Sequence, residues 1–158
     1  MTVSKRLKEL LDSKSIGYTV MTHKVAYTAQ EVAAKQGVTG WQVAKSVVLK
    51  CDDQFALVVV QAPTKVDFDR IKKVLKCGDA RLASEAEMEK LFPGVEIGAE
   101  SPFGNLYDIP VYVDKALTEV SEIVFNAGTH TETVRMKYDD YAALVKPKIV
   151  EISKPAKV

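Results

Sequence analysis

A single cation, Lys45, lies where a turn gives way to the β-branched and apolar stretch 46–50. Alternate side chains of a strand share a face, so Lys45 shares its face with Val47 and Leu49. An ammonium group beside an apolar wall is costly unless it reaches water, a carboxylate or an anionic ligand. The spacing alone therefore favours a lysine whose stem covers the core edge and whose charge reaches solvent, and a functional role needs support from elsewhere.

Two glycine-containing turns are candidates to complete a site around this lysine. In the loop 98–104, two glycines bracket Pro102, so the backbone can approach a ligand closely and aim N–H groups at a carbonyl oxygen. In the turn 128–130, His130 follows a glycine at the end of a predicted strand, where it could bind substrate, transfer a proton or satisfy a local carbonyl. Glycine and proline alone favour ordinary connecting turns in both places.

Other kinds of chemistry lack their sequence patterns. There is no nucleophile-elbow motif, no phosphate-binding loop ending in Gly-Lys-Ser/Thr and no dinucleotide fingerprint. The two cysteines, Cys51 and Cys77, lack the close spacing of a zinc site, and we expect each to be a free structural thiol. The residues thus imply no metal.

Composition and charge narrow the class of protein. With 158 residues, 47% of them hydrophobic and 27% charged, we expect a single domain over residues 1–158, in which 153–158 form a loose tail. The 22 basic residues are balanced by 21 acidic ones, which disfavours binding along a duplex but allows a small contact with the end of a nucleic acid. The N-terminal residues lack an apolar secretory core and no run reaches membrane-spanning length, so we expect a cytoplasmic protein.

The order of helical and strand patterns predicts an α+β fold without regular strand–helix alternation. Capping residues at Thr28, Asp67 and Ser84 open three predicted helices, which Gly37, Gly78 and Pro93 end. Further helices are expected from Val3 to before Gly17 and over 139–145. The predicted strands are 18–21, 46–50, 55–61, 109–113, 123–126, 133–137 and 149–152, of which 46–50 and 55–61 form a hairpin.

The ordered set of motifs resembles the YbaK/prolyl-tRNA-synthetase-associated domain family of aminoacyl-tRNA editing domains. The resemblance extends over roughly residues 7–152. The matching segments, in chain order, are Tyr27-Thr28-Ala29-Gln30-Glu31, Val43-Ala44-Lys45-Ser46, Gly98 to Pro102 and Asn126-Ala127-Gly128-Thr129-His130. Each motif is weak alone, whereas their order is fairly specific.

The resemblance implies a mixed, strongly curved β-sheet flanked by helices, and hydrolysis of the ester that joins a wrong amino acid to the 3′ end of a tRNA. It implies a free-standing editing enzyme acting on tRNA for proline that carries a small residue such as alanine, or cysteine, with prolyl-tRNA synthetase as a further partner. Lys45 would be the essential cation, and no cofactor would be needed. The implied substrate-binding residues are Tyr27, Ser46, Gly98, Ser101, Pro102, Gly128, Thr129 and His130.

Two other readings stay open from the residues alone. A domain of the same fold could bind a nucleotide or aminoacyl-nucleotide without turnover, or the lysine could serve only the structure. The local chemistry fits an electrostatic or positioning role for Lys45, because an ordinary lysine is protonated at neutral pH and is a poor base there.

Overall fold

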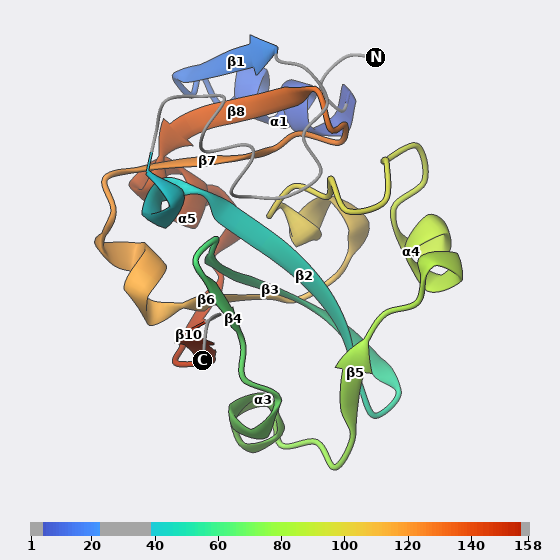
Figure 1. The fold of residues 1–158 in the computed structure, drawn as a ribbon. Coiled ribbons are helices and arrows are strands. Elements are labelled where there is room, and N and C mark those ends of the chain that lie inside the picture. Colours follow the sequence, from blue (N-terminus) through green and yellow to red (C-terminus); the bar gives the residue numbers. More distant parts are fainter. Residues whose placement is uncertain (1–4, 23–38, 156–158) are drawn as a thin grey trace.

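The computed structural model describes residues 5–22 and 39–155 (Figure 1). The predicted helix 28–37 and the candidate residue Tyr27 lie outside these ranges. The helices are α1 (Lys5–Ser13), α3 (Phe68–Leu75), α4 (Glu85–Leu91) and α5 (Tyr138–Val145), with 3-10 helices η1 (Gly40–Gln42), η2 (Gly104–Tyr107) and η3 (Lys115–Glu119). The strands are β1 (Tyr18–Thr22), β2 (Ala44–Cys51), β3 (Gln54–Gln61), β4 (Thr64–Val66), β5 (Ala80–Leu82), β6 (Val111–Asp114), β7 (Glu122–Asn126), β8 (Glu132–Lys137), β9 (Lys148–Val150) and β10 (Ser153–Pro155).

Two main sheets organise the described chain. A five-stranded sheet has the order β5-β2-β3-β6-β9, in which β2 and β3 pair antiparallel while β6 pairs parallel with both β3 and β9. A three-stranded antiparallel sheet has the order β1-β8-β7. A single parallel bridge between Val43 and Val124 sets the start of β2 beside β7. The mixed α+β architecture predicted from the sequence is therefore confirmed.

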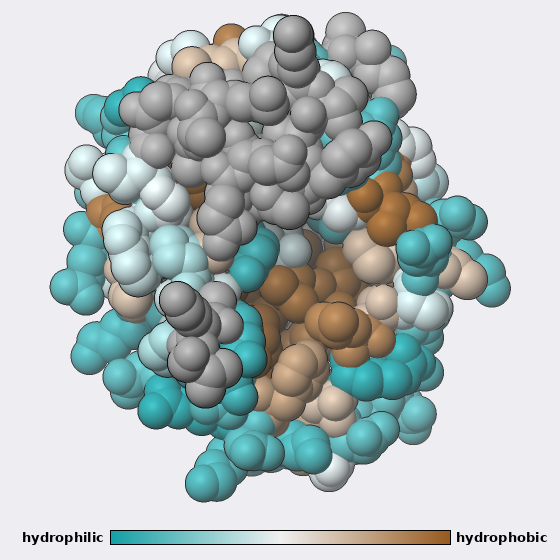
Figure 2. Space-filling view, in the orientation of Figure 1, coloured by the Kyte–Doolittle hydropathy of each residue, from teal (hydrophilic) through white to brown (hydrophobic). Residues whose placement is uncertain are grey.

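The long hairpin of β2 and β3 separates two apolar clusters because its side chains alternate between faces. Val48 and its neighbours Leu57 and Val59 belong to the larger core, which also contains α1 and the three-stranded sheet. Leu49, with Val58 and Val60, faces a second cluster under α3. Some apolar side chains remain exposed to solvent. They line a hollow between β2 and α4 (Figure 2).

The predicted helix caps form as expected where the structure describes them. The Asp67 carboxylate accepts the backbone N–H groups of Asp69 and Arg70 at the start of α3. Ser84 and Glu87 form a reciprocal capping box on α4, and the Arg81 guanidinium helps to lower the pKa of Glu87 to about 2. These bonds satisfy N–H groups that have no partner inside the helix.

Three local predictions are wrong. Helix α3 ends before Gly78, because Lys76 already takes the left-handed conformation with φ 56°. Residues 153–155 are no loose tail, since they form β10, which pairs with β4. Cys51 and Cys77 are joined in a disulfide rather than free, with Cα atoms 5.8 Å apart, within the span that a disulfide bridges. The two cysteines are 26 residues apart in sequence, and local patterns could not predict the contact because it depends on how the end of α3 meets the hairpin turn.

Among the described helices, none is long and apolar enough to cross a membrane.

Candidate active site

The Gly98 loop and the His130 turn, which lie far apart in sequence, are joined by backbone hydrogen bonds. The Glu96 N–H donates to the Gly128 carbonyl oxygen, and the Gly128 N–H donates to the Ala99 carbonyl oxygen, both at 2.9 Å. Gly128 has φ 99°, a value that glycine adopts without strain. The two turns predicted to line one pocket are thus held against each other.

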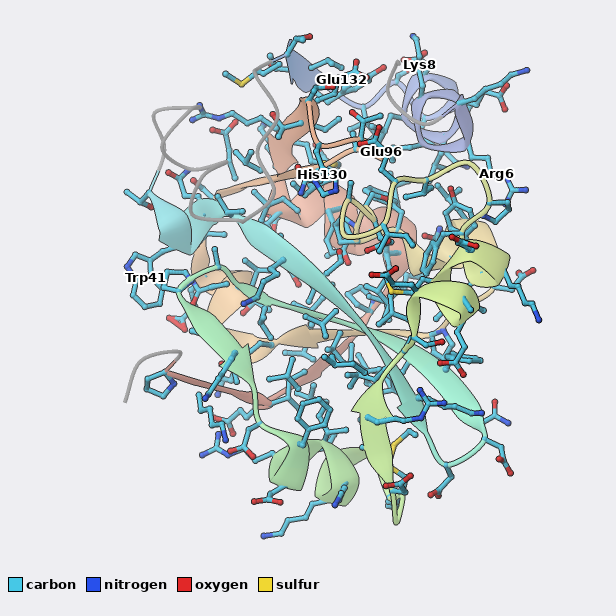
Figure 3. The ribbon with its side chains drawn as sticks, turned by 45° about the vertical axis from the view of Figure 1, so that its right-hand side comes forward. Arg6, Lys8, Trp41, Glu96, His130 and Glu132 are labelled. Carbon is cyan, nitrogen blue, oxygen red and sulfur yellow. A yellow bond between two sulfur atoms is a disulfide. The ribbon has the colours of Figure 1, made fainter. Side chains whose placement is uncertain are left out.

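Two glutamates that the sequence analysis did not select fix this junction. Oε1 of Glu96 accepts the backbone N–H of His130 at 2.8 Å, and the two residues lie side by side in Figure 3. Oε2 of Glu100 accepts the backbone N–H of Gly98 at 3.0 Å. Burial raises the pKa of Glu100, and the Gly98 N–H partly opposes that rise. The Gly98 N–H is therefore occupied within the loop, so a donor to a substrate oxyanion would have to be another group.

The His130 ring is positioned by Gly98 and its neighbour. Nε2 lies 2.8 Å from the carbonyl oxygen of Ile97 and must donate a proton there, because a carbonyl can only accept. Gly98 has φ 88°, and a Cβ at this position would lie 3.4 Å from Cε1 of the ring. His130 itself is buried. Glycine is needed here for the backbone conformation, and an added Cβ would come into van der Waals contact with the imidazole.

The far end of the loop is fastened to the core. The hydroxyl of Tyr141 on α5 donates to the Pro102 carbonyl oxygen at 2.7 Å, and burial raises the pKa of this tyrosine well above its ordinary value. The ring of Phe103 contacts Tyr141 edge-on at 5.1 Å between centroids. Ser101 is buried beside them. Pro102 therefore holds the loop in place through its carbonyl group.

Lys45 lies on the face of β2 that its spacing predicted. It pairs with Val60 across the hairpin, and it is half-buried. Its Nζ donates to the Thr64 carbonyl oxygen at 2.7 Å, while no acidic residue of the described chain forms an ion pair with it. Burial without a carboxylate partner lowers the pKa of Lys45. The described contacts of this ammonium group include neither the Gly98 loop nor the His130 turn.

The chain that leads into Lys45 lies close to the strand that leads into the His130 turn. A single parallel bridge joins Val43 to Val124 of β7, and Asn126 lies two residues after Val124 on the same face of β7. Asn126 is paired with Thr133 across β7 and β8, so Thr133 shares that face. The turn between these strands contains His130. The bridge therefore brings the start of β2, two residues before Lys45, close to the strand that leads into this turn.

Thr133 is a candidate functional residue that sequence reasoning missed, and Asn126 begins a matching motif of which only later residues were selected as site residues. Thr133 is completely buried, and its hydroxyl has no hydrogen-bond partner within the described structure. The buried Oδ1 atom of Asn126 is likewise without a partner there. Buried polar atoms are rarely left unpaired unless they serve a ligand or a water molecule. No distinctive sequence signal marks Thr133, because polar residues alternate with apolar ones along β8, and only the register brings it opposite Asn126.

Ser46 and Thr129, two further predicted substrate-binding residues, lie in different parts of the fold. Ser46 lies on the opposite face of β2 from Lys45, toward the larger core, and its buried hydroxyl has no partner in the described part of the chain. Thr129 is buried, and its hydroxyl oxygen accepts the Thr131 N–H at 3.3 Å, which shapes the turn. Ser46 is thus separated from the face that carries Lys45.

Comparison with known proteins shows which family the chain belongs to. The family model for the aminoacyl-tRNA editing domain matches residues 23–144. The chain belongs to this family. The multifunctional Ser/Thr-tRNA deacylase ProXp-y of Escherichia coli (strain K12) is 29% identical over 157 residues, covering 96% of this chain and 93% of that protein. The prolyl-tRNA editing protein ProX of Acetoanaerobium sticklandii is 28% identical over 142 residues, covering 86% of each.

The fold of the editing family also matches in three dimensions. The crystal structure of a proposed trans-editing enzyme for prolyl-tRNA synthetase superimposes with a TM-score of 0.84 at 22% identity, covering 97% of this chain and 99% of that one. The resemblance drawn from the sequence motifs and the expectation of an aminoacyl-tRNA deacylase are confirmed at the level of the family. The roles of individual residues stay predictions.

Proposed function

We propose that this protein is a trans-editing hydrolase that removes a small wrong amino acid from the 3′ end of tRNA for proline. Water attacks the ester carbonyl carbon, the bond to the ribose oxygen breaks, and the products are a free amino acid and an uncharged tRNA. An aminoacyl ester is already activated, so modest stabilisation of the tetrahedral oxyanion is sufficient. This chemistry needs no redox partner and no second substrate besides water.

The observation that carries the proposal is the position of Lys45. A partly desolvated ammonium group without an acidic partner retains its electrostatic strength for a ligand, and the strand that carries it begins beside β7, which leads into the His130 turn. Lys45 would move from the Thr64 carbonyl toward the ester oxygen or the terminal phosphate when substrate binds. A preorganised donor of this kind typically contributes about 3 kcal/mol to the transition state.

The proposed pocket selects by size and polarity. The wall formed by His130 against Gly98 limits the side chain that can enter, which favours alanine or cysteine over larger residues. The unpaired Thr133 hydroxyl and Asn126 amide oxygen favour a second candidate, a hydroxyl-bearing residue such as serine or threonine. The similarity to a Ser/Thr-tRNA deacylase supports that second candidate. One methylene in an apolar pocket is worth only about 1–3 kcal/mol, whereas a hydrogen bond to a substrate hydroxyl discriminates more strongly.

The test is a panel of proline tRNAs charged with alanine, cysteine, serine, threonine and proline, incubated with the protein and with Lys45→Ala. We expect the variant to lower kcat/KM roughly a hundredfold on the preferred ester. Lys50→Ala is the matched control, because Lys50 lies on the same strand and its Nζ is 3.9 Å from Glu87. Equal ester loss with the wild type and Lys45→Ala would contradict the proposal. Tight binding of every charged tRNA without hydrolysis would instead support a non-catalytic binding domain.

A further inference from the structure

Trp41, the single tryptophan of the chain, is displayed to solvent from a fixed backbone. Its side chain is 53% exposed, and Figure 3 shows it projecting outward at the start of β2. The buried Gln61 side chain donates from Nε2 to the Trp41 carbonyl oxygen at 3.0 Å. Gly40 lies so close to Pro63 that an added Cβ would be 3.1 Å from Cγ of the proline ring. A large aromatic ring is thus kept in water by a rigid support, which is typical of binding surfaces.

Two unpaired lysines lie across the pair of strands that follows the segment supporting Trp41. Lys65 on β4 and Lys154 on β10 are directly opposite each other in the antiparallel register, and both are exposed. Like charges in this arrangement are destabilising on their own. No carboxylate of the described residues forms an ion pair with either lysine. An anion between them would remove that repulsion.

The same segment connects this surface to the candidate active site. Thr64, next to Lys65, provides the carbonyl oxygen that accepts the ammonium group of Lys45. Pro63 precedes it and contacts the glycine next to Trp41. The segment 63–65 therefore links the backbone support of Trp41, the hydrogen bond of Lys45 and one lysine of the pair.

We propose that Trp41, Lys65 and Lys154 bind the unpaired 3′ strand of the tRNA, with the indole stacked on a base and the lysines on phosphates. This inference rests on the proposed function and adds a nucleotide-binding surface to it. Aromatic rings stack on bases of any sequence, and cations follow the backbone, which is how single strands are held without base reading. The overall charge balance fits such a local contact, because the cations needed are few.

The single tryptophan makes the contact directly measurable. We would titrate the protein with an uncharged RNA minihelix that ends in an unpaired CCA strand, and with the same minihelix lacking that strand. We expect the CCA-ended RNA to quench the Trp41 fluorescence and the blunt RNA to leave it unchanged. Unchanged fluorescence with both RNAs, or equal quenching by both, would overturn the proposal.

Variants separate stacking from charge, with labelled RNA as the reporter. Trp41→Ala should weaken binding by about 5- to 150-fold, the range for loss of one stacked base, while Trp41→Phe retains most of it. Leu82→Ala, at a second exposed apolar side chain, is the control. Removing both Lys65 and Lys154 should reduce the slope of log affinity against log salt by about 1.4, at about 0.7 per phosphate contact on a single strand. As a control, removing Lys73 and Lys148, two other exposed lysines, should leave the slope of log affinity against log salt unchanged.

These experiments distinguish a failure of the RNA-binding proposal from a failure of the proposed editing function. If Trp41→Ala binds the CCA-ended RNA as tightly as the wild type while ester hydrolysis proceeds normally, the surface proposal is wrong and the editing function stands. If the wild type binds this RNA with Trp41 quenched but hydrolyses no charged tRNA, the surface is supported and the catalytic proposal fails.

Discussion

The two sides of the candidate site contrast in how their polar groups are satisfied. On the side of the joined turns, the carboxylates of Glu96 and Glu100 accept backbone N–H groups, and backbone hydrogen bonds join residues 96–99 to Gly128. The His130 ring is held by the Ile97 carbonyl oxygen. On the side of the sheet, Thr133 and Asn126 have buried polar atoms without partners in the described structure, and Lys45 has a single carbonyl acceptor. One side is internally complete, and the other retains unused hydrogen-bonding capacity.

This difference suggests a division of work. We call the joined turns 96–100 and 128–130 the wall, and the side that carries Lys45, Asn126 and Thr133 the sheet face. The polar groups of the wall satisfy each other, so the wall can select a substrate by shape but has few free hydrogen-bonding groups for a reacting ester. Groups that are buried and unsatisfied cost stability in the empty protein, and they recover it when a ligand supplies the missing partners. We therefore expect changes on the wall to alter stability and selectivity, and changes on the sheet face to alter recognition and rate.

The largest combined effect is expected for Gly98→Ala, which breaks the wall. A non-glycine residue at φ 88° costs roughly 1–3 kcal/mol, and the new Cβ comes into contact with the His130 ring at 3.4 Å. We expect lower stability in denaturant unfolding and a decrease in kcat/KM that differs from ester to ester, because the shape of the wall beside the His130 ring changes. Gly94→Ala is the matched control, since Gly94 has φ 81° but nothing within 4 Å of an added Cβ. It should lose similar backbone stability and retain activity, and equal activity losses in both variants would contradict the role of the ring contact.

His130→Ala should change selectivity more than rate. Removing the imidazole leaves space beside Gly98, so larger amino acids can enter, and discrimination against the prolyl ester should fall roughly tenfold or more. The measurement is kcat/KM for alanyl, threonyl and prolyl tRNA. His130→Gln, which keeps a donor near the Ile97 carbonyl, should preserve more of the selectivity. A uniform collapse of activity in a folded His130→Ala protein would argue against a shaping role.

Thr133→Val tests the opposite side. Replacing an unpaired buried hydroxyl by a methyl group of similar shape should leave stability unchanged or raise it by up to about 1 kcal/mol. Hydrolysis of seryl and threonyl esters should fall relative to alanyl ester, because the hydroxyl partner is lost. Thr133→Ser, which keeps the hydroxyl, should restore that ratio. A loss of stability in Thr133→Val would show that the hydroxyl has a structural partner instead.

The sequence predicted this contrast only in part, because local and long-range information differ. The caps at Asp67 and Ser84 and the β2–β3 hairpin follow from neighbouring residues, and all are confirmed. The contact between the Gly98 loop and the His130 turn could be predicted only through the family resemblance. The Cys51–Cys77 disulfide and strand β10 depend on which distant segments meet, a choice that local patterns do not encode.

The same limit applies to the residues of the site. Lys45 stood out because a charge interrupts an apolar strand, and its face was predicted correctly from parity with Val47 and Leu49. Glu100 and Thr133 look like ordinary loop and strand residues in the sequence. Their interest comes from burial and from the presence or absence of partners, which exist only in the folded chain.

The smallest expected effect is a pH dependence of stability from Glu100, the one carboxyl of the wall whose pKa burial raises. The folded protein then holds this proton at pH values where the unfolded chain, with the ordinary value near 4.5, has released it. The unfolding free energy contributed by Glu100 therefore falls as pH rises from about 4.5 to its raised pKa, and is level above that. Glu100→Gln can still accept the Gly98 N–H but does not titrate, so the difference in unfolding free energy between wild type and variant should decline over that interval. Glu89→Gln, in an exposed position of α4, is the control. A difference that rises with pH would mean that the hydrogen bond from Gly98, not burial, controls the Glu100 carboxyl, and the wall would then be stabilised by its charge.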